Sequence, residues 1–130
     1  IFNNITKYYD SLCTKLDVSD KVDWCGYLNK NKMDEMYFNC DLFLFPSKLE
    51  SFGLPLVEAA ARRKHILAMD TSFSRELLGN YEAAAFLSND AKEWAQYINE
   101  FYKNELQLTN RKIDYYHKTN DFSVLDLLLK

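Results

Sequence analysis

The sequence is poor in the residue types that build disulfide frameworks and metal centres. Its 130 residues include 3 cysteines and 2 histidines. The cysteines (Cys13, Cys25 and Cys40) form no CxxC pair and are odd in number, so we expect small buried apolar side chains in a reducing compartment rather than disulfides. His65 and His117 lie far apart in the sequence, so we expect no bound metal.

Long apolar runs and an excess of positive charge are also missing. No apolar stretch approaches the roughly 20 residues of a membrane-spanning helix, and no signal peptide opens the chain. A net charge of -3 argues against a nucleic-acid partner, because binding along a phosphate backbone needs a basic surface. These absences predict a cytoplasmic protein. The chain begins at Ile1 inside a helical pattern, so we expect a segment of a longer protein.

What the sequence does contain is an alternation of short apolar runs with helical patterns. Runs of four residues at 22–25, 42–45, 66–69 and 84–87 predict strands. Period-3.6 spacing predicts helices near 1–16, 29–39, 55–63, 72–78 and 90–101, with a helical tail at about 107–130. The residues expected to cap helices are Asn29, Ser72 or Ser74, and Asn89 or Asp90.

This alternation predicts an α/β fold, formed by a single domain over residues 1–130. We expect a Rossmann-like parallel sheet with helices on both faces. The run at 42–45 is apolar throughout, so we expect a strand that is covered on both faces. Ligands of such sheets bind beyond the carboxyl ends of the strands, where residues 46–58 follow this run.

These residues carry the most specific chemistry in the chain. The stretch DLFLFPSKLESFGLPLVE places Glu50 and Gly53 in a loop, Pro55 at the start of a helix and Glu58 one turn into it. The N–H groups and the dipole at a helix start favour an anion. Carboxylates accept hydrogen bonds from the vicinal hydroxyls of a sugar or ribose. The stretch therefore predicts a site for a ligand that carries both phosphate and sugar.

Each acid also has a simpler interpretation. Glu58 alone would be an acid that complements the dipole of its helix, and Glu50 alone would be a solvated loop carboxylate. The functional interpretation depends on the combination of both acids with Gly53 and Pro55, in fixed order after a buried strand.

The stretch PSKLESFGLPLVEAAA resembles the signature of retaining, GT-B-type glycosyltransferases, the glycosyl transferases group 1 family, which includes relatives of glycogen and sucrose synthase. The resemblance covers roughly residues 15 to 105 and implies the later part of the C-terminal, donor-binding domain. The matching residues are Pro46, Ser47, Glu50, Phe52, Gly53 and Glu58.

The resemblance implies a role for each residue of the site. Glu58 would bind the ribose hydroxyls of a UDP-, GDP- or ADP-sugar, and Glu50, the candidate catalytic residue, would bind the transferred sugar and help place it for departure. The other donor-binding residues would be Tyr27, at the base, and Ser51, Phe52, Gly53 and Leu54, at the sugar and diphosphate.

The implied reaction transfers a sugar, with retention, to a hydroxyl of a glycan or lipid-linked acceptor in bacterial-type polysaccharide or glycolipid biosynthesis. Front-face attack needs no protein nucleophile, and no cofactor is expected. The acceptor would bind an N-terminal domain that this chain lacks, so we expect the chain to be inactive alone.

The sequence departs from the family pattern in several places. Lys64 and His65 stand where the family has Gly and Pro, and we expect His65 to be a surface or packed residue rather than a base. TSFSRE replaces a glycine-rich stretch and keeps Glu76. No match is found for the basic pair that grips the diphosphate, or for the two leading strands.

Alternatives stay open for the function and for two charged features. The chain is either part of a transferase, a nucleotide-sugar-binding module without activity of its own, or part of a nucleotide-sugar epimerase. Arg62, Arg63 and Lys64 either complement a helix C-terminus or make a peripheral contact with the inner face of an anionic membrane. Arg75 either pairs with Glu76 on the surface or faces the diphosphate.

Overall fold

The computed structural model describes residues 2–103, so the predicted helical tail at 107–130 lies outside the described residues. The chain divides into two compact units, Ile1–Met33 and Asp34–Lys130, and each is described by itself. The assignment of a single domain to residues 1–130 stays a prediction.

In the first unit, helix α1 (Phe2–Lys15) is followed by the 3-10 turn η1 (Ser19–Lys21). The predicted strand at 22–25 is wrong. Val22 has extended dihedrals, φ -124° and ψ 118°, but no strand forms there. A strand exists only where its backbone bonds to a neighbouring strand. Within residues 2–103, every such pairing belongs to the sheet of the second unit.

That sheet has three parallel strands, β1 (Leu42–Phe45), β2 (His65–Met69) and β3 (Ala84–Leu87), in the order β1-β2-β3. Leu42 pairs with His65, and Ile66 pairs with Ala84. The predicted positions of these strands are therefore confirmed, with β2 starting one residue earlier than expected.

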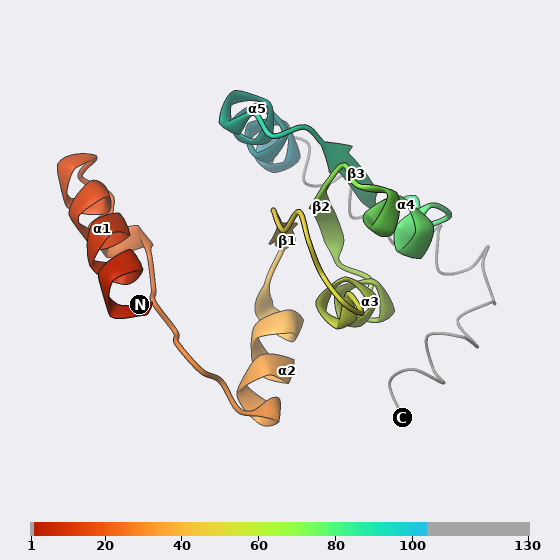
Figure 1. Cartoon of the computed structure of the whole chain (residues 1–130), viewed down its shortest axis with the longest axis horizontal. Coiled ribbons are helices and arrows are strands. Elements are labelled where there is room, and N and C mark those ends of the chain that lie inside the picture. Colours follow the sequence, from red (N-terminus) through yellow and green to blue (C-terminus); the bar gives the residue numbers. More distant parts are fainter. Residues whose placement is uncertain (1, 104–130) are drawn as a thin grey trace. The chain divides into compact units, whose positions relative to one another are not determined.

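The helices of this part of the chain are α2 (Lys30–Asn39), α3 (Leu54–Ala61), α4 (Ser72–Leu78) and α5 (Ala91–Lys103). Figure 1 shows α3 and α4 on one side of the sheet and α5 on the other. The predicted Rossmann-like α/β architecture, with helices on both faces of a parallel sheet, is confirmed.

Short polar side chains begin three of these helices. The Lys32 N–H donates to Asn29 Oδ1 at 3.0 Å, and the Lys92 N–H donates to Asp90 Oδ1 at 3.0 Å, as predicted for both caps. Helix α4 differs, because its N-cap is Thr71 rather than Ser72 or Ser74. Ser74 instead completes a capping box by accepting from the Thr71 N–H.

Burial is deepest at the middle strand. All five residues of β2 are buried, whereas β1 is an edge strand on which Leu44 is 44% exposed. The expectation that residues 42–45 are covered on both faces is therefore wrong, because no packed layer of the described residues covers the Leu44 side chain. His65 is 5% exposed, and its ring meets the Phe101 ring edge-on at 5.3 Å, which confirms a packed role.

The three cysteines are free thiols, but they are not the buried side chains that we expected. Cys25 is exposed, and Cys13 and Cys40 are half-buried. Cys25 ends the segment at 22–25, which joins no sheet within residues 2–103 and so lacks the covered faces of a paired strand.

Candidate functional site

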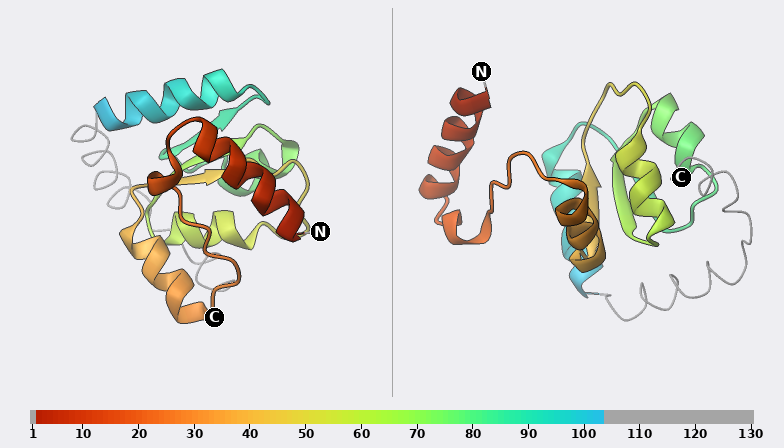
Figure 2. Two further views of the ribbon diagram at one scale, coloured as in Figure 1. Left: turned by 90° about the vertical axis from the view of Figure 1, so that its left-hand side faces the viewer. Right: turned by 90° about the horizontal axis from the view of Figure 1, so that it is seen from below.

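The loop between β1 and α3 lies beyond the carboxyl end of a parallel strand, where the sequence predicted the site. Strand β1 ends at Phe45 and α3 begins at Leu54. In the right-hand view of Figure 2 the loop, drawn in yellow, arches beyond β1 and returns into α3. Within it, Ser47 Oγ donates to the Leu49 carbonyl oxygen at 2.8 Å. Ligands of open α/β sheets bind in this position.

The start of α3 limits which backbone groups can bind an anion. Gly53 is the N-cap, in the left-handed conformation with φ 59° and ψ 27°. Pro55 has no N–H, and it is not the first helical residue as predicted, because Leu54 precedes it in α3. The N–H groups of Leu56 and Val57 donate to the Gly53 carbonyl at 3.0 and 3.2 Å. An anion would therefore bind to N–H groups that precede Pro55.

The two acids lie on either side of this helix start. Glu50 is exposed, and its Oε1 accepts a hydrogen bond from the Ser51 N–H at 3.1 Å. Glu58 is half-buried, and the first turn of α3 contains no acid. The effect of a helix dipole is largely limited to that first turn, so stabilisation by the dipole of α3 explains the presence of Glu58 poorly.

The remaining predicted site residues differ in exposure. Ser51 is exposed, the Phe52 side chain is 77% exposed and Leu54 is 47% exposed, whereas Gly53 is buried. These residues share one loop and helix start with Glu50 and Glu58. Tyr27 belongs to the first unit, where it is 97% exposed. Its predicted contact with a base stays a prediction.

Helix α4 packs against the loop at Gly53. A Cβ atom on this glycine would lie 2.2 Å from Phe73 Cζ and 2.5 Å from Leu77 Cδ1. The backbone therefore approaches α4 as closely as it does because residue 53 has no side chain. Phe73 belongs to the stretch TSFSRE, which departs from the glycine-rich pattern of the family.

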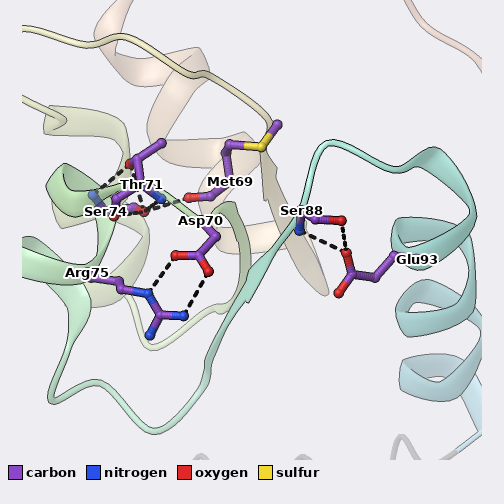
Figure 3. A network of polar contacts seen from close by, with 7 residues as sticks. All are labelled: Met69, Asp70, Thr71, Ser74, Arg75, Ser88 and Glu93. Carbon is purple, nitrogen blue, oxygen red and sulfur yellow. Dashed lines mark hydrogen bonds and ion pairs between the residues drawn. The ribbon is translucent and has the colours of Figure 1, made fainter.

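A bidentate ion pair follows the carboxyl end of β2 (Figure 3). Arg75 Nε and Nη2 donate to the two carboxylate oxygens of Asp70, at 2.5 and 2.9 Å. Hydrogen bonding and the charge of Arg75 hold the pKa of Asp70 below its usual value. The Arg75 guanidinium also lies over the Phe86 ring, 4.8 Å from its centroid. The predicted surface pair of Arg75 with Glu76 is therefore wrong.

At the end of β3, Ser88 is hydrogen-bonded to the Glu93 carboxylate, as Figure 3 also shows. The Ser88 N–H donates to Glu93 Oε2 at 2.8 Å, and Trp94 Nε1 donates to the Ser88 carbonyl oxygen at 2.8 Å. Sequence reasoning missed both Asp70 and Ser88. The signal for them was their position, because each directly follows a predicted strand.

The basic cluster of residues 62–64 bonds to nearby helix ends. Arg62 Nη1 donates to the Glu58 carbonyl oxygen at 3.0 Å, and the guanidinium forms an ion pair with Asp34. Lys64 Nζ donates to the Phe38 carbonyl oxygen at 2.8 Å. Arg62 and Lys64 thus complement the C-terminal ends of α3 and α2, as the simpler interpretation predicted. Contact with a membrane stays a prediction.

Residues 2–103 contain neither a metal-binding cluster nor a membrane-spanning helix. No group of three or more His, Cys, Asp or Glu side chains in this range is arranged to hold a metal ion. No helix in this range is both long enough and apolar enough to span a bilayer.

The sequence profile of the family described as Glycosyl transferases group 1 matches residues 4–119. The match covers most of the chain, which therefore belongs to this family. The family predicted from Glu50, Gly53 and Glu58 is confirmed.

Curated relatives include enzymes of sugar transfer. The alpha-galactosylglucosyldiacylglycerol synthase of Streptococcus pneumoniae is 30% identical over 90% of this chain and 36% of its own length. The serotype-specific mannosyltransferase WbdA of Escherichia coli is 28% identical over 65% of this chain and 12% of its own length. The uncharacterized glycosyltransferase MJ1607 of Methanocaldococcus jannaschii is 24% identical over 85% of this chain and 30% of its own length.

The chain thus spans 12% to 36% of the length of these relatives. No solved structure matches it.

Proposed function

We propose that this chain forms the donor-binding part of a glycosyltransferase that uses a nucleotide-sugar. Glu58 binds the ribose hydroxyls, and Glu50 binds hydroxyls of the transferred sugar and helps place it for departure. The N–H groups of Phe52, Gly53 and Leu54 bind the diphosphate or sugar, and Tyr27 contacts the base.

The observation that carries this proposal is the pair of acids flanking a glycine-capped helix start at the carboxyl end of β1. Oriented N–H groups suit a diphosphate, and accessible carboxylates suit hydroxyls. Glu50 is exposed and Glu58 is half-buried, so both retain surface that a ligand can reach. The family membership of the chain supports the same ligand class.

The sugar is transferred with retention, by front-face attack and without a protein nucleophile or a bound metal. The acceptor is a hydroxyl of a glycan or lipid-linked molecule in polysaccharide or glycolipid biosynthesis. The names of two relatives, a mannosyltransferase and a glycolipid synthase, support these acceptor classes. The protein works in the cytoplasm, at the inner face of the membrane when its acceptor is a lipid.

A second candidate is a nucleotide-sugar-binding module that performs no chemistry by itself. This candidate is favoured because the chain spans only a small share of the length of its relatives, 36% for the glycolipid synthase. In this case the chain binds the donor, and the acceptor site lies in a different part of the protein.

Calorimetry with UDP, GDP and ADP tests the donor site in the chain itself. We expect one of the three to bind, and Glu58→Ala to weaken it about 10- to 100-fold, as expected for lost hydrogen bonds to a charged group. Glu82→Gln is the matched control, because Glu82 is exposed and precedes β3 at the opposite end of a strand. It should leave the affinity unchanged.

Because the chain alone is expected to be inactive under both candidates, the test that separates them uses this chain joined to an acceptor-binding domain, incubated with a labelled nucleotide-sugar and acceptor. Transfer supports the enzyme, whereas binding without turnover supports the module. The donor-site assignment is wrong if none of the three nucleotides binds, or if Glu58→Ala and Glu82→Gln bind as tightly as the unmodified chain.

A further inference from the structure

Helix α2 places a buried phenol against the start of α3. The Tyr37 side chain is 3% exposed, and its hydroxyl donates to the Pro55 carbonyl oxygen at 3.4 Å. The Glu58 carboxylate belongs to the next turn of α3 after Pro55, and its negative charge is coupled electrostatically to this hydroxyl. Burial and the Glu58 carboxylate raise the pKa of Tyr37 well above its usual range, so the phenol stays protonated and able to donate.

Arg62 holds the ring of this tyrosine. Its guanidinium lies over the Tyr37 ring, 5.0 Å from the centroid, and forms an ion pair with Asp34. The ion pair joins α2 to the C-terminal end of α3, because Asp34 lies on α2 and Arg62 is the C-cap of α3. Asp34 and Tyr37 lie three residues apart, and Glu58 and Arg62 lie four apart. Each pair therefore occupies one helix face, and the ring is kept against α3 with its hydroxyl at Pro55 and Glu58.

We propose that Tyr37 is a positioning residue of the donor site, whose buried hydroxyl orients the Glu58 carboxylate toward the ribose hydroxyls of the nucleotide. The inference rests on the proposed function, since it gives Tyr37 a role in the same site. A carboxylate offers about four acceptor positions, so one bond from Tyr37 leaves room for two vicinal hydroxyls. Fixing the Glu58 rotamer before the ligand arrives also removes part of the entropic cost of binding.

Tyr37→Phe tests this role, because it removes the hydroxyl and keeps the buried ring beneath Arg62. The measurement is calorimetry of the chain with the nucleoside diphosphate that binds it, and with the 2′,3′-dideoxy form of that nucleotide. We expect Tyr37→Phe to weaken the ribonucleotide about 5- to 10-fold, the effect of one lost hydrogen bond, and to change the dideoxy affinity less than about twofold. In a Glu58→Ala background, Tyr37→Phe should have no further effect.

Tyr81→Phe is the matched control for loss of a buried phenol. Tyr81 is 7% exposed, and its hydroxyl donates to the Lys64 carbonyl oxygen at 2.7 Å, at the amino-terminal end of β2. This variant should match Tyr37→Phe in lost thermal stability and bind both nucleotides like the unmodified chain. Such a result separates an effect on Glu58 from a general loss of stability.

Two results would overturn the role of Tyr37 while leaving the proposed function standing. In the first, Tyr37→Phe weakens the ribonucleotide and the dideoxynucleotide equally. In the second, its effect persists in the Glu58→Ala background. If the unmodified chain binds neither nucleotide, or binds both with equal affinity, the ribose contact of Glu58 is wrong and the role of Tyr37 falls with it.

Discussion

The ring of Phe73, on α4, occupies the space that a side chain at residue 53 would need. A Cβ atom on Gly53 would lie 2.2 Å from Phe73 Cζ, and Gly53 itself has a left-handed φ of 59°. The glycine of the signature loop therefore serves two purposes. It allows the backbone to turn into α3, and it allows α4 to approach the loop that carries Glu50.

We predict that Gly53→Ala lowers the free energy of unfolding by about 2–4 kcal/mol, because left-handed strain and overpacking are both introduced. Gly26→Ala is the control, since Gly26 has a similar φ of 60° and a Cβ atom there would meet no atom of the described residues within 4 Å. The control should cost only about 1–2 kcal/mol, the strain alone. Urea unfolding followed by circular dichroism measures both.

Phe73→Ala separates the two contributions at residue 53. If contact with the ring causes the extra cost, Gly53→Ala should be less destabilising in a Phe73→Ala background than in the unmodified protein. Equal costs in the two backgrounds would show that the Phe73 ring adds nothing, and that backbone strain and the Leu77 side chain account for the whole effect.

A second prediction concerns the capping box of α4. Ser74 is 2% exposed, its Oγ accepts from the Thr71 N–H at 3.1 Å, and it donates to the Met69 carbonyl oxygen at 2.5 Å. Ser74→Ala should therefore lower the free energy of unfolding by about 1–3 kcal/mol, since buried backbone groups lose their partner. Ser72→Ala, at an exposed position in the same helix, should change it by less than about 0.5 kcal/mol. Thermal unfolding of the two variants checks the difference, and equal effects would contradict it.

Local sequence patterns were sufficient to predict most helices and strands of the second unit. Apolar runs of four residues identified β1 and β3 at their observed bounds, and Asp90 was identified as a cap, because these features depend on neighbours in the sequence. The prediction of a strand at 22–25 failed, in a segment whose apolar residues are interrupted by Asp23. Its strand would require pairing with a second strand, which no local pattern specifies. The exposure of Leu44 was missed for a related reason, since cover of a strand face depends on which elements pack over the sheet.

The site was predictable to the extent that it is contiguous. Glu50, Gly53 and Glu58 lie on one loop and helix start, so their order in the sequence already implied their proximity. The partners of the site come from other elements. Phe73 reaches Gly53 from α4, and Tyr37 reaches the Pro55 carbonyl oxygen from α2, contacts that depend on how helices pack around the sheet.

A third prediction concerns the pH dependence of the Asp70–Arg75 pair. Hydrogen bonding to Arg75 lowers the pKa of Asp70 from its ordinary value of 3.8. The stability that the carboxylate contributes is therefore present above pH 3.8 and is lost as the pH falls through the lowered pKa. In a carboxyl NMR titration, the midpoint of Asp70 should lie below 3.8 and return toward 3.8 in Arg75→Gln. An unchanged midpoint in the variant would show that Arg75 is not the cause.

The last prediction separates the roles of the two acids. Glu50 is proposed to bind the sugar and Glu58 the ribose, so their substitutions should differ between a nucleotide-sugar and its nucleoside diphosphate. Glu50→Gln should weaken only the nucleotide-sugar, by about 5- to 10-fold, because the diphosphate lacks the hydroxyls that Glu50 binds. Glu58→Gln should weaken both ligands by the same factor, because both contain the ribose. Calorimetry with the two ligands measures these ratios, and an equal loss of both ligands in Glu50→Gln would place this acid at the nucleotide instead of the sugar.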